Sequence, residues 1–246
     1  MSGNWDFYFC TVDDKVASIF VDLDLIQRAP VAGLDAMVYL RLYLRFPRED
    51  GLSSQQEYEA LAGLEDEVTQ RAVMAGALYV GRNTTDGFRD FVFYCADSDK
   101  CVATLRETMR AYSDYKFDCD ARPDPQWSVY REFLYPAPRA RQTIENRRVY
   151  AALEQNGDAL TQPREIDHWI YFADAYSRGV FVEDCRALGF ALRAMREPDS
   201  GNAQFGVQIF RVDVPNANSF DGVVTQLFDL AKQTGGEYDG WETKVI

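Results

Sequence analysis

The sequence contains a single histidine and none of the short motifs that mark a nucleophile or a phosphate-binding loop. Neither G-x-S-x-G nor G-x-x-x-x-G-K-[ST] nor G-x-G-x-x-G occurs, so no motif supports acyl transfer or nucleotide binding. The five cysteines are widely spaced and form no C-x-x-C pair, which speaks against a zinc knuckle or a thioredoxin-type site. We therefore predict no catalytic residue, no cofactor and no metal, and we expect the cysteines to be buried free thiols.

Basic residues are also scarce. The chain has 26 Lys and Arg against 39 Asp and Glu, a net charge of −13 at pH 7, and a pI near 4.6. Sequence-independent binding to nucleic acid requires a basic surface that neutralises phosphates, and anionic membranes likewise attract basic segments. We therefore expect no direct nucleic-acid or membrane binding, and instead a protein partner with a basic segment.

Long apolar runs are missing as well. The longest uncharged stretch, Ser200–Phe210, is far shorter than the roughly 18 apolar residues that a membrane helix needs. Met1–Cys10 has neither the basic region nor the apolar region of a signal peptide. We therefore expect a cytoplasmic protein. The 47% hydrophobic and 26% charged residues are typical of a globular chain, and 246 residues suffice for one large domain or two small ones.

The apolar pattern of the first half predicts the order βαββαβ behind a leading hairpin. Met37–Phe46, for example, places an apolar side chain at every second position, which is typical of a strand with one buried face. The expected helices begin at Ser53 or Ser54 and near Asp97. The expected strands are Asn4–Thr11, Val16–Leu23, Met37–Phe46, Leu78–Gly81, Gly87–Tyr94, Tyr115–Asp120 and, as one more, Trp127–Tyr135.

The second half repeats this order of elements without evident sequence identity. Helices are expected at 140–156, 173–188 and 218–234, and strands at 166–172, 190–196, 204–214 and 237–245, with a turn at Pro198–Asn202. Pro136-Ala-Pro138 interrupts regular structure between the halves. We therefore predict an α+β protein of two tandem ferredoxin-like (βαββαβ) domains with antiparallel sheets, residues 1–138 and 139–246, the first with an extra N-terminal hairpin.

Aromatic and acidic residues gather in two segments of the second half, 163–169 and 235–242. On a half-buried strand, Asp167 and Trp169 would share one face and His168 the other. Aromatic rings beside carboxylates suit the capture of a basic segment through packing, cation–π contact and ion pairing. The alternative is that the two tryptophans complete the core. We predict a partner-binding surface made of Asp167, His168, Trp169, Tyr238, Asp239, Trp241 and Glu242.

Two other functions remain open from the residues alone. One is a small-ligand-binding protein or an enzyme whose site lies in the cleft between the domains and uses His168, Tyr238 and Asp239. The other is RNA binding by aromatic residues on a sheet. The aromatic signature of that class is missing, so we expect its candidates to be core residues: Phe91, Phe93, Phe205 and Phe210.

Several motifs resemble known families. Gly157-Asp158, Pro163-Arg164, the strand from Ile166 to Phe172 and Gly236-Glu-Tyr-Asp-Gly-Trp241 resemble the regulator of ribonuclease E activity B family, over residues 139–246. The first half, residues 1–135, is similar to the domain of unknown function 695 family. The residues that carry this second similarity are Trp5, Pro47, Gly51-Leu52, Glu57, Leu61, Leu64-Glu65, Phe91 and Tyr94.

The first resemblance implies a ferredoxin-like protein that is not an enzyme. It implies binding to the non-catalytic scaffold region of ribonuclease E, inhibition of that endonuclease and altered RNA decay. The founding type of this family carries a long acidic tail after the Tyr-Asp-Gly-Trp strand, whereas Thr243-Lys-Val-Ile246 follows that strand here.

Overall fold

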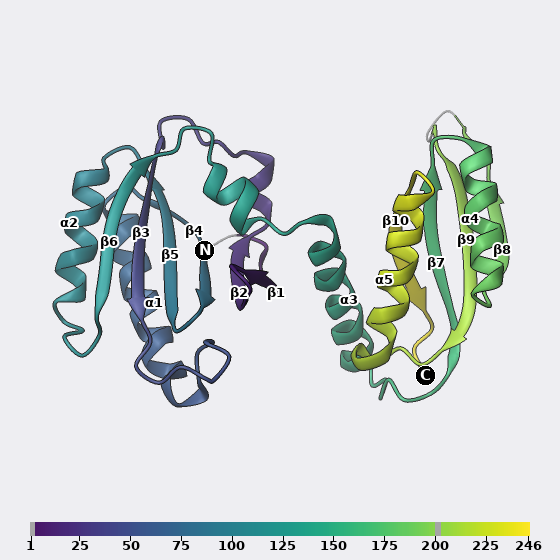
Figure 1. Cartoon of the computed structure of the whole chain (residues 1–246), viewed down its shortest axis with the longest axis horizontal. Helices are drawn as coiled ribbons and strands as arrows, with labels where there is room; N and C mark the ends of the chain where they lie inside the picture. The colour runs from purple at the N-terminus through teal and green to yellow at the C-terminus, as the bar shows by residue number, and fades with distance from the viewer. Residues whose placement is uncertain (1–2, 200–202) are drawn as a thin grey trace. The chain divides into compact units, whose positions relative to one another are not determined.

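The computed structural model describes residues 3–199 and 203–246, and the chain divides into two compact units, Met1–Ala140 and Arg141–Ile246 (Figure 1). Each unit has its own antiparallel sheet and its own hydrophobic core. The predicted α+β class with two tandem ferredoxin-like domains is confirmed. Within the described ranges, no helix is both long enough and apolar enough to cross a membrane.

Unit 1 contains a six-stranded sheet in the order β1-β2-β4-β5-β3-β6. Its four-stranded part, β4-β5-β3-β6, has the strand order of a ferredoxin-like βαββαβ unit, and the predicted N-terminal hairpin extends it beyond β4. The elements are β1 (Trp5–Val12), β2 (Lys15–Asp22), β3 (Ala36–Tyr43), α1 (Tyr58–Met74), β4 (Leu78–Thr85), β5 (Phe88–Cys95), α2 (Ser98–Met109) and β6 (Phe117–Pro123).

Local sequence explains how the first hairpin and α2 begin, whereas the start of α1 predicted at Ser53 or Ser54 is wrong: Ser54 precedes a 3-10 turn without a side-chain cap, and α1 begins at Tyr58. Asp13 and Asp14 both adopt a positive φ, and they form the two-residue turn between β1 and β2 because Asp tolerates this conformation. The side chain of Asp97 accepts a hydrogen bond from the Lys100 N–H at 3.0 Å and thereby caps α2. Leu61 and Leu64 of α1 pack with Leu105 of α2 in the core that covers one face of the sheet.

The opposite face of this sheet is covered by residues predicted as a strand, and that prediction is wrong. Val129–Leu134 forms a π-helical turn (η3), and the Trp127 ring stacks on Tyr94 with 4.0 Å between centroids. The Trp127 indole N–H donates to the Leu34 carbonyl at 2.8 Å. Trp127 precedes this turn, Tyr130 and Leu134 belong to it, and all three side chains are fully buried.

Unit 2 has a four-stranded sheet in the order β10-β7-β9-β8, again the ferredoxin-like arrangement. Helices α4 and α5 are capped by Asp174 and Asn216, and Gly189 follows α4 with a φ of +84°, the conformation expected after a helix end. The predicted turn at Pro198–Asn202 lies partly outside the described residues. The elements are α3 (Pro138–Gln155), β7 (Arg164–Phe172), α4 (Ala175–Ala187), β8 (Ala191–Arg196), β9 (Phe205–Asp213), α5 (Ala217–Gln233) and β10 (Gly236–Thr243).

The packing of Trp127 predicts a large loss of stability when its ring is removed. We expect Trp127→Ala to lower the free energy of unfolding by about 3–5 kcal/mol, because it empties a fully buried site against Tyr94. Phe133→Ala, on the same turn but 39% exposed, is the matched control and should cost much less. Urea unfolding followed by far-UV circular dichroism checks this, and equal effects of the two substitutions would contradict the described packing.

Candidate functional site

Strands β7 and β10 divide the predicted site residues between the two faces of the unit 2 sheet. His168 is fully buried beneath the helices, whereas its neighbours Asp167 and Trp169 are half-buried on the other face. On β10, Tyr238 and Trp241 are buried. The remaining two predicted residues, Asp239 and Glu242, are exposed. The prediction that all seven form one surface is therefore corrected, because side chains alternate across a sheet.

His168 lies in an apolar setting that keeps its imidazole neutral. Its Nδ1 and the Tyr238 hydroxyl share a hydrogen bond at 2.7 Å, and Phe190 and Phe220 flank the ring. Within the described part of the chain, Nε2 has no hydrogen-bond partner. Burial, reinforced by the nearby Arg211 guanidinium, lowers the pKa of His168 to about 3. The imidazole thus belongs to the core, together with Tyr238.

Trp241 completes the same core. The alternative that the tryptophans are core residues therefore holds for Trp241, whereas Trp169 is half-buried on the other face. Its indole N–H donates to the Asn146 side-chain oxygen at 2.9 Å, and the Asn146 amide donates to Asp221 at 2.9 Å. The Tyr150 hydroxyl also donates to Asp221, at 2.7 Å. These contacts join α3 and α5 to β10. The sequence analysis missed Asn146 and Asp221, which carry no motif and meet only in the folded unit.

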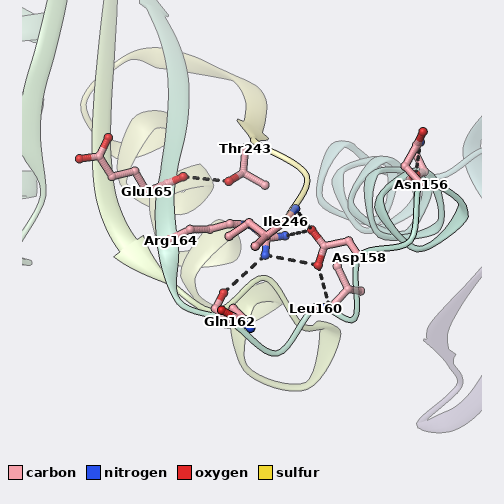
Figure 2. A network of polar contacts seen from close by, with 9 residues as sticks. Asn156, Asp158, Leu160, Gln162, Arg164, Glu165, Thr243 and Ile246 are labelled. Carbon is pink, nitrogen blue, oxygen red and sulfur yellow. Dashed lines mark hydrogen bonds and ion pairs between the residues drawn. The ribbon is translucent and has the colours of Figure 1, made fainter.

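Two segments of the motif described in the sequence analysis, Gly157-Asp158 and Pro163-Arg164, are joined by a buried ion pair. Arg164 Nη2 lies 2.7 Å from Asp158 Oδ2, and both side chains are buried (Figure 2). The Asp158 carboxylate also accepts from the N–H groups of Leu160 and Ile246. Burial acts to raise the pKa of Asp158, but these donors and the guanidinium outweigh it, so the net pKa lies below the ordinary value. The motif is therefore structural and anchors the segment after β10.

The face of the unit 2 sheet that carries Glu165, Asp167 and Trp169, hereafter the open face, combines aromatic rings, carboxylates and two arginines. Arg193 forms ion pairs with Asp167 and with Glu165, the latter at 2.7 Å. Its guanidinium carbon lies 4.1 Å from the centroid of the Phe210 ring. Arg196 lies over Trp169 in the same way, at 4.7 Å. Both arginines are thus held against aromatic rings.

The acids of the open face outnumber its two arginines. Glu242 stands opposite Asp167 in the β10–β7 register, and Glu237 stands opposite Tyr171, so both carboxylates belong to this face. Each is exposed. The sequence analysis missed the role of the arginines because a bulge between Leu192 and Ala194 in β8 shifts the alternation there, and a bulge leaves no reliable signal in one sequence.

Other candidates from the sequence take structural positions. Phe91 and Phe93 are fully buried in the core of unit 1, as predicted, whereas Phe205 and Phe210 are half-buried. All five cysteines are free; Cys10 is half-buried and the other four are buried. Among the residues that the structure describes, no group of His, Cys, Asp and Glu is arranged to hold a metal ion.

Comparison with known proteins identifies two families in the chain. The family of unknown function DUF695 matches residues 3–135, and regulator of ribonuclease activity B matches residues 143–243. No curated protein was found to match.

Two solved structures are similar only at a low level. One is a proposed glycine cleavage system transcriptional repressor, with 10% identity, coverage of 85% of this chain and 98% of that one, and a TM-score of 0.23. The other is an unknown protein from Galdieria sulphuraria, with 12% identity, coverage of 86% and 99%, and a TM-score of 0.24. These scores are too low to define a shared fold.

The lowered pKa of His168 predicts how stability depends on pH. An unfolded histidine has a pKa of about 6.5, so the unfolded chain binds a proton between pH 6.5 and 3 that the native chain does not. Stability contributed by neutral His168 is present above pH 6.5 and is lost as the pH falls. From about pH 7 to about pH 5 the loss should reach about 2 kcal/mol through this group.

Urea unfolding at both pH values, for the natural chain and for His168→Gln, isolates this contribution, because the variant lacks the titrating group. The stability difference between the two pH values should shrink by the stated amount in the variant. Since the chain has one histidine, its imidazole resonances are also unambiguous in NMR spectra. A titration of the native protein with a midpoint near the ordinary value would contradict the burial of His168.

Proposed function

Because the chain belongs to the DUF695 family through residues 3–135 and carries a regulator of ribonuclease activity B domain at residues 143–243, we propose that it is a protein-binding regulator of RNA decay. In this proposal the chain has no catalytic activity of its own and acts in the cytoplasm. Its partner is the non-catalytic scaffold region of ribonuclease E, through a basic segment, and its binding inhibits that endonuclease.

The open face is the observation that carries this proposal. It offers a rigid indole, Trp169, and a neighbouring ring, Phe210, at the centre of a four-stranded sheet. Exposed Glu242 and Glu237 lie along β10, on the same face. Aromatic anchors surrounded by charged residues are typical of the energetic centre of a protein interface. A basic segment of the partner would pack on the rings and pair with these acids.

Arg193 and Arg196 give this surface a way to accept an incoming cation. Both lie over aromatic rings, and Arg193 occupies the carboxylates of Glu165 and Asp167 in the free chain. The Arg193–Glu165 pair is exposed, and exposed ion pairs contribute little net free energy, so a partner arginine can replace this pair at small cost. We propose that the partner's basic side chains take over these contacts.

Replacement of Trp169 tests the proposed surface. Trp169→Ala should weaken binding to the recombinant scaffold region of ribonuclease E by at least about thirtyfold, the effect of losing an interface anchor. Tyr176→Ala is the matched control, because Tyr176 is 82% exposed at the start of α4, on the helical layer. Surface plasmon resonance with the full chain, at about 50 mM and about 500 mM salt, measures both affinity and its electrostatic part.

We expect the control to bind like the natural chain and the higher salt to weaken all binding. Equal affinities of Trp169→Ala and the natural chain would contradict the open face as the binding surface. If the natural chain fails to bind at the lower salt, ribonuclease E is not the partner.

A further inference from the structure

A cavity of about 600 Å³ lies in unit 1, where the N-terminal hairpin widens the sheet beyond α1. Two helices suffice to cover the four ferredoxin-like strands, so the added strands β1 and β2 leave a hollow beside α1. Its walls come from the hairpin, α1 and strands β4 and β5. The volume lies within the range of small-molecule sites.

The inner wall of this cavity carries more positive than negative charge. Arg82 Nε lies 3.1 Å from the carboxylate of Glu65, and Arg89 Nη1 lies 3.6 Å from the same oxygen. Two guanidinium groups thus share the Glu65 carboxylate, and the buried Glu57 carboxylate also interacts with Arg89. Arg48 and Asp66 also line the cavity, and Arg48 pairs with Asp50 at 2.6 Å. The lining itself holds three arginines against two acids, in a chain of charge −13.

Buried donors in this cavity lack partners. In the described residues, Arg82 Nη1 and Thr69 Oγ1 are buried and form no hydrogen bond, and both residues line the cavity. Thr69 is 4% exposed. An unpaired buried polar group costs free energy, and an anion that meets these groups after a small side-chain rearrangement at Arg82 and Thr69 would remove that cost. Burial is the main cause that lowers the pKa of Arg89 to about 10, and repulsion from the Arg82 charge adds to it. Arg89 is therefore still charged at neutral pH.

The rest of the lining is aromatic. The Trp5 ring is stacked between Phe20 and Tyr79, with centroid distances of 5.1 and 5.3 Å. Phe9 and Tyr58 also line the cavity and are 60% and 62% exposed. Large exposed rings beside a polar pocket are typical of a binding site. The cavity therefore fits a molecule with a planar apolar body and one anionic group.

We propose that this cavity binds a small aromatic carboxylate, with the carboxylate at Arg82 and Thr69 and the ring against Phe9 and Tyr58. A single negative charge matches the excess of one arginine over the acids among the lining residues. This ligand site is independent of the open face of unit 2 and of the function proposed for it. It assigns a binding activity to the family-of-unknown-function part of the chain.

Calorimetric titration of the full chain with indole-3-acetate tests this site, with indole-3-ethanol as the uncharged analogue of the same ring. We expect the carboxylate to bind at least about tenfold more tightly than the alcohol, since a hydrogen bond to a charged group is being gained. Arg82→Gln should remove this preference. Arg110→Gln is the matched control, because the Arg110 side chain is 78% exposed and lies outside the cavity.

Thr69→Val provides a second variant in case Arg82→Gln does not fold, because it removes only a hydroxyl that has no partner. It should keep or raise stability while weakening indole-3-acetate binding several-fold. Equal affinity for the acid and the alcohol, or no binding of either by the natural chain, would overturn the proposal. So would a variant at position 69 or 82 that folds and keeps the full preference for the carboxylate.

Discussion

Two helices on one face of a four-stranded sheet leave the other face without cover, and this constraint governs both units of the chain. In unit 1, residues 124–135 return across the uncovered face and bury the rings of Trp127 and Tyr130 against it. In unit 2, Trp169 and Phe210 on the open face are half-buried beneath arginines. The same fold therefore gives one closed sheet and one that presents a surface.

The limited width that two helices can cover also matters for the hairpin at the start of unit 1. Its strands extend the sheet past the width that α1 and α2 can cover, so a hollow forms on the helical side. Polar residues of β4 and β5 that would face a helix in a four-stranded domain, Arg82 and Arg89, face this hollow instead. Glu65 of α1 forms ion pairs with both arginines, and the buried Glu57 also interacts with Arg89.

Charge has different roles in the two units. The strongly acidic composition disfavours a broad basic surface, and both arginines of the open face are engaged, Arg193 with two carboxylates and a ring and Arg196 with a ring. What remains free to act on a partner is acidic. The cavity in unit 1 is the opposite case, because burial there concentrates two guanidinium groups around one carboxylate. The net charge of the chain predicts the acidic open face, but it does not predict the pair of guanidinium groups in the cavity.

The periodicity of apolar residues was enough to predict both βαββαβ units, the extra hairpin and the opposite faces of Asp167 and His168, because alternation and helical spacing are local properties. The strand predicted at Trp127–Tyr135 is wrong, because Val129–Leu134 forms a π-helical turn that packs on the sheet. Local pattern could not show which of two apolar faces would be covered. That choice placed Tyr238 and Trp241 in the core and Trp169 on the open face. It was made by tertiary packing, since burial depends on segments far apart in sequence that meet only when the sheet is assembled.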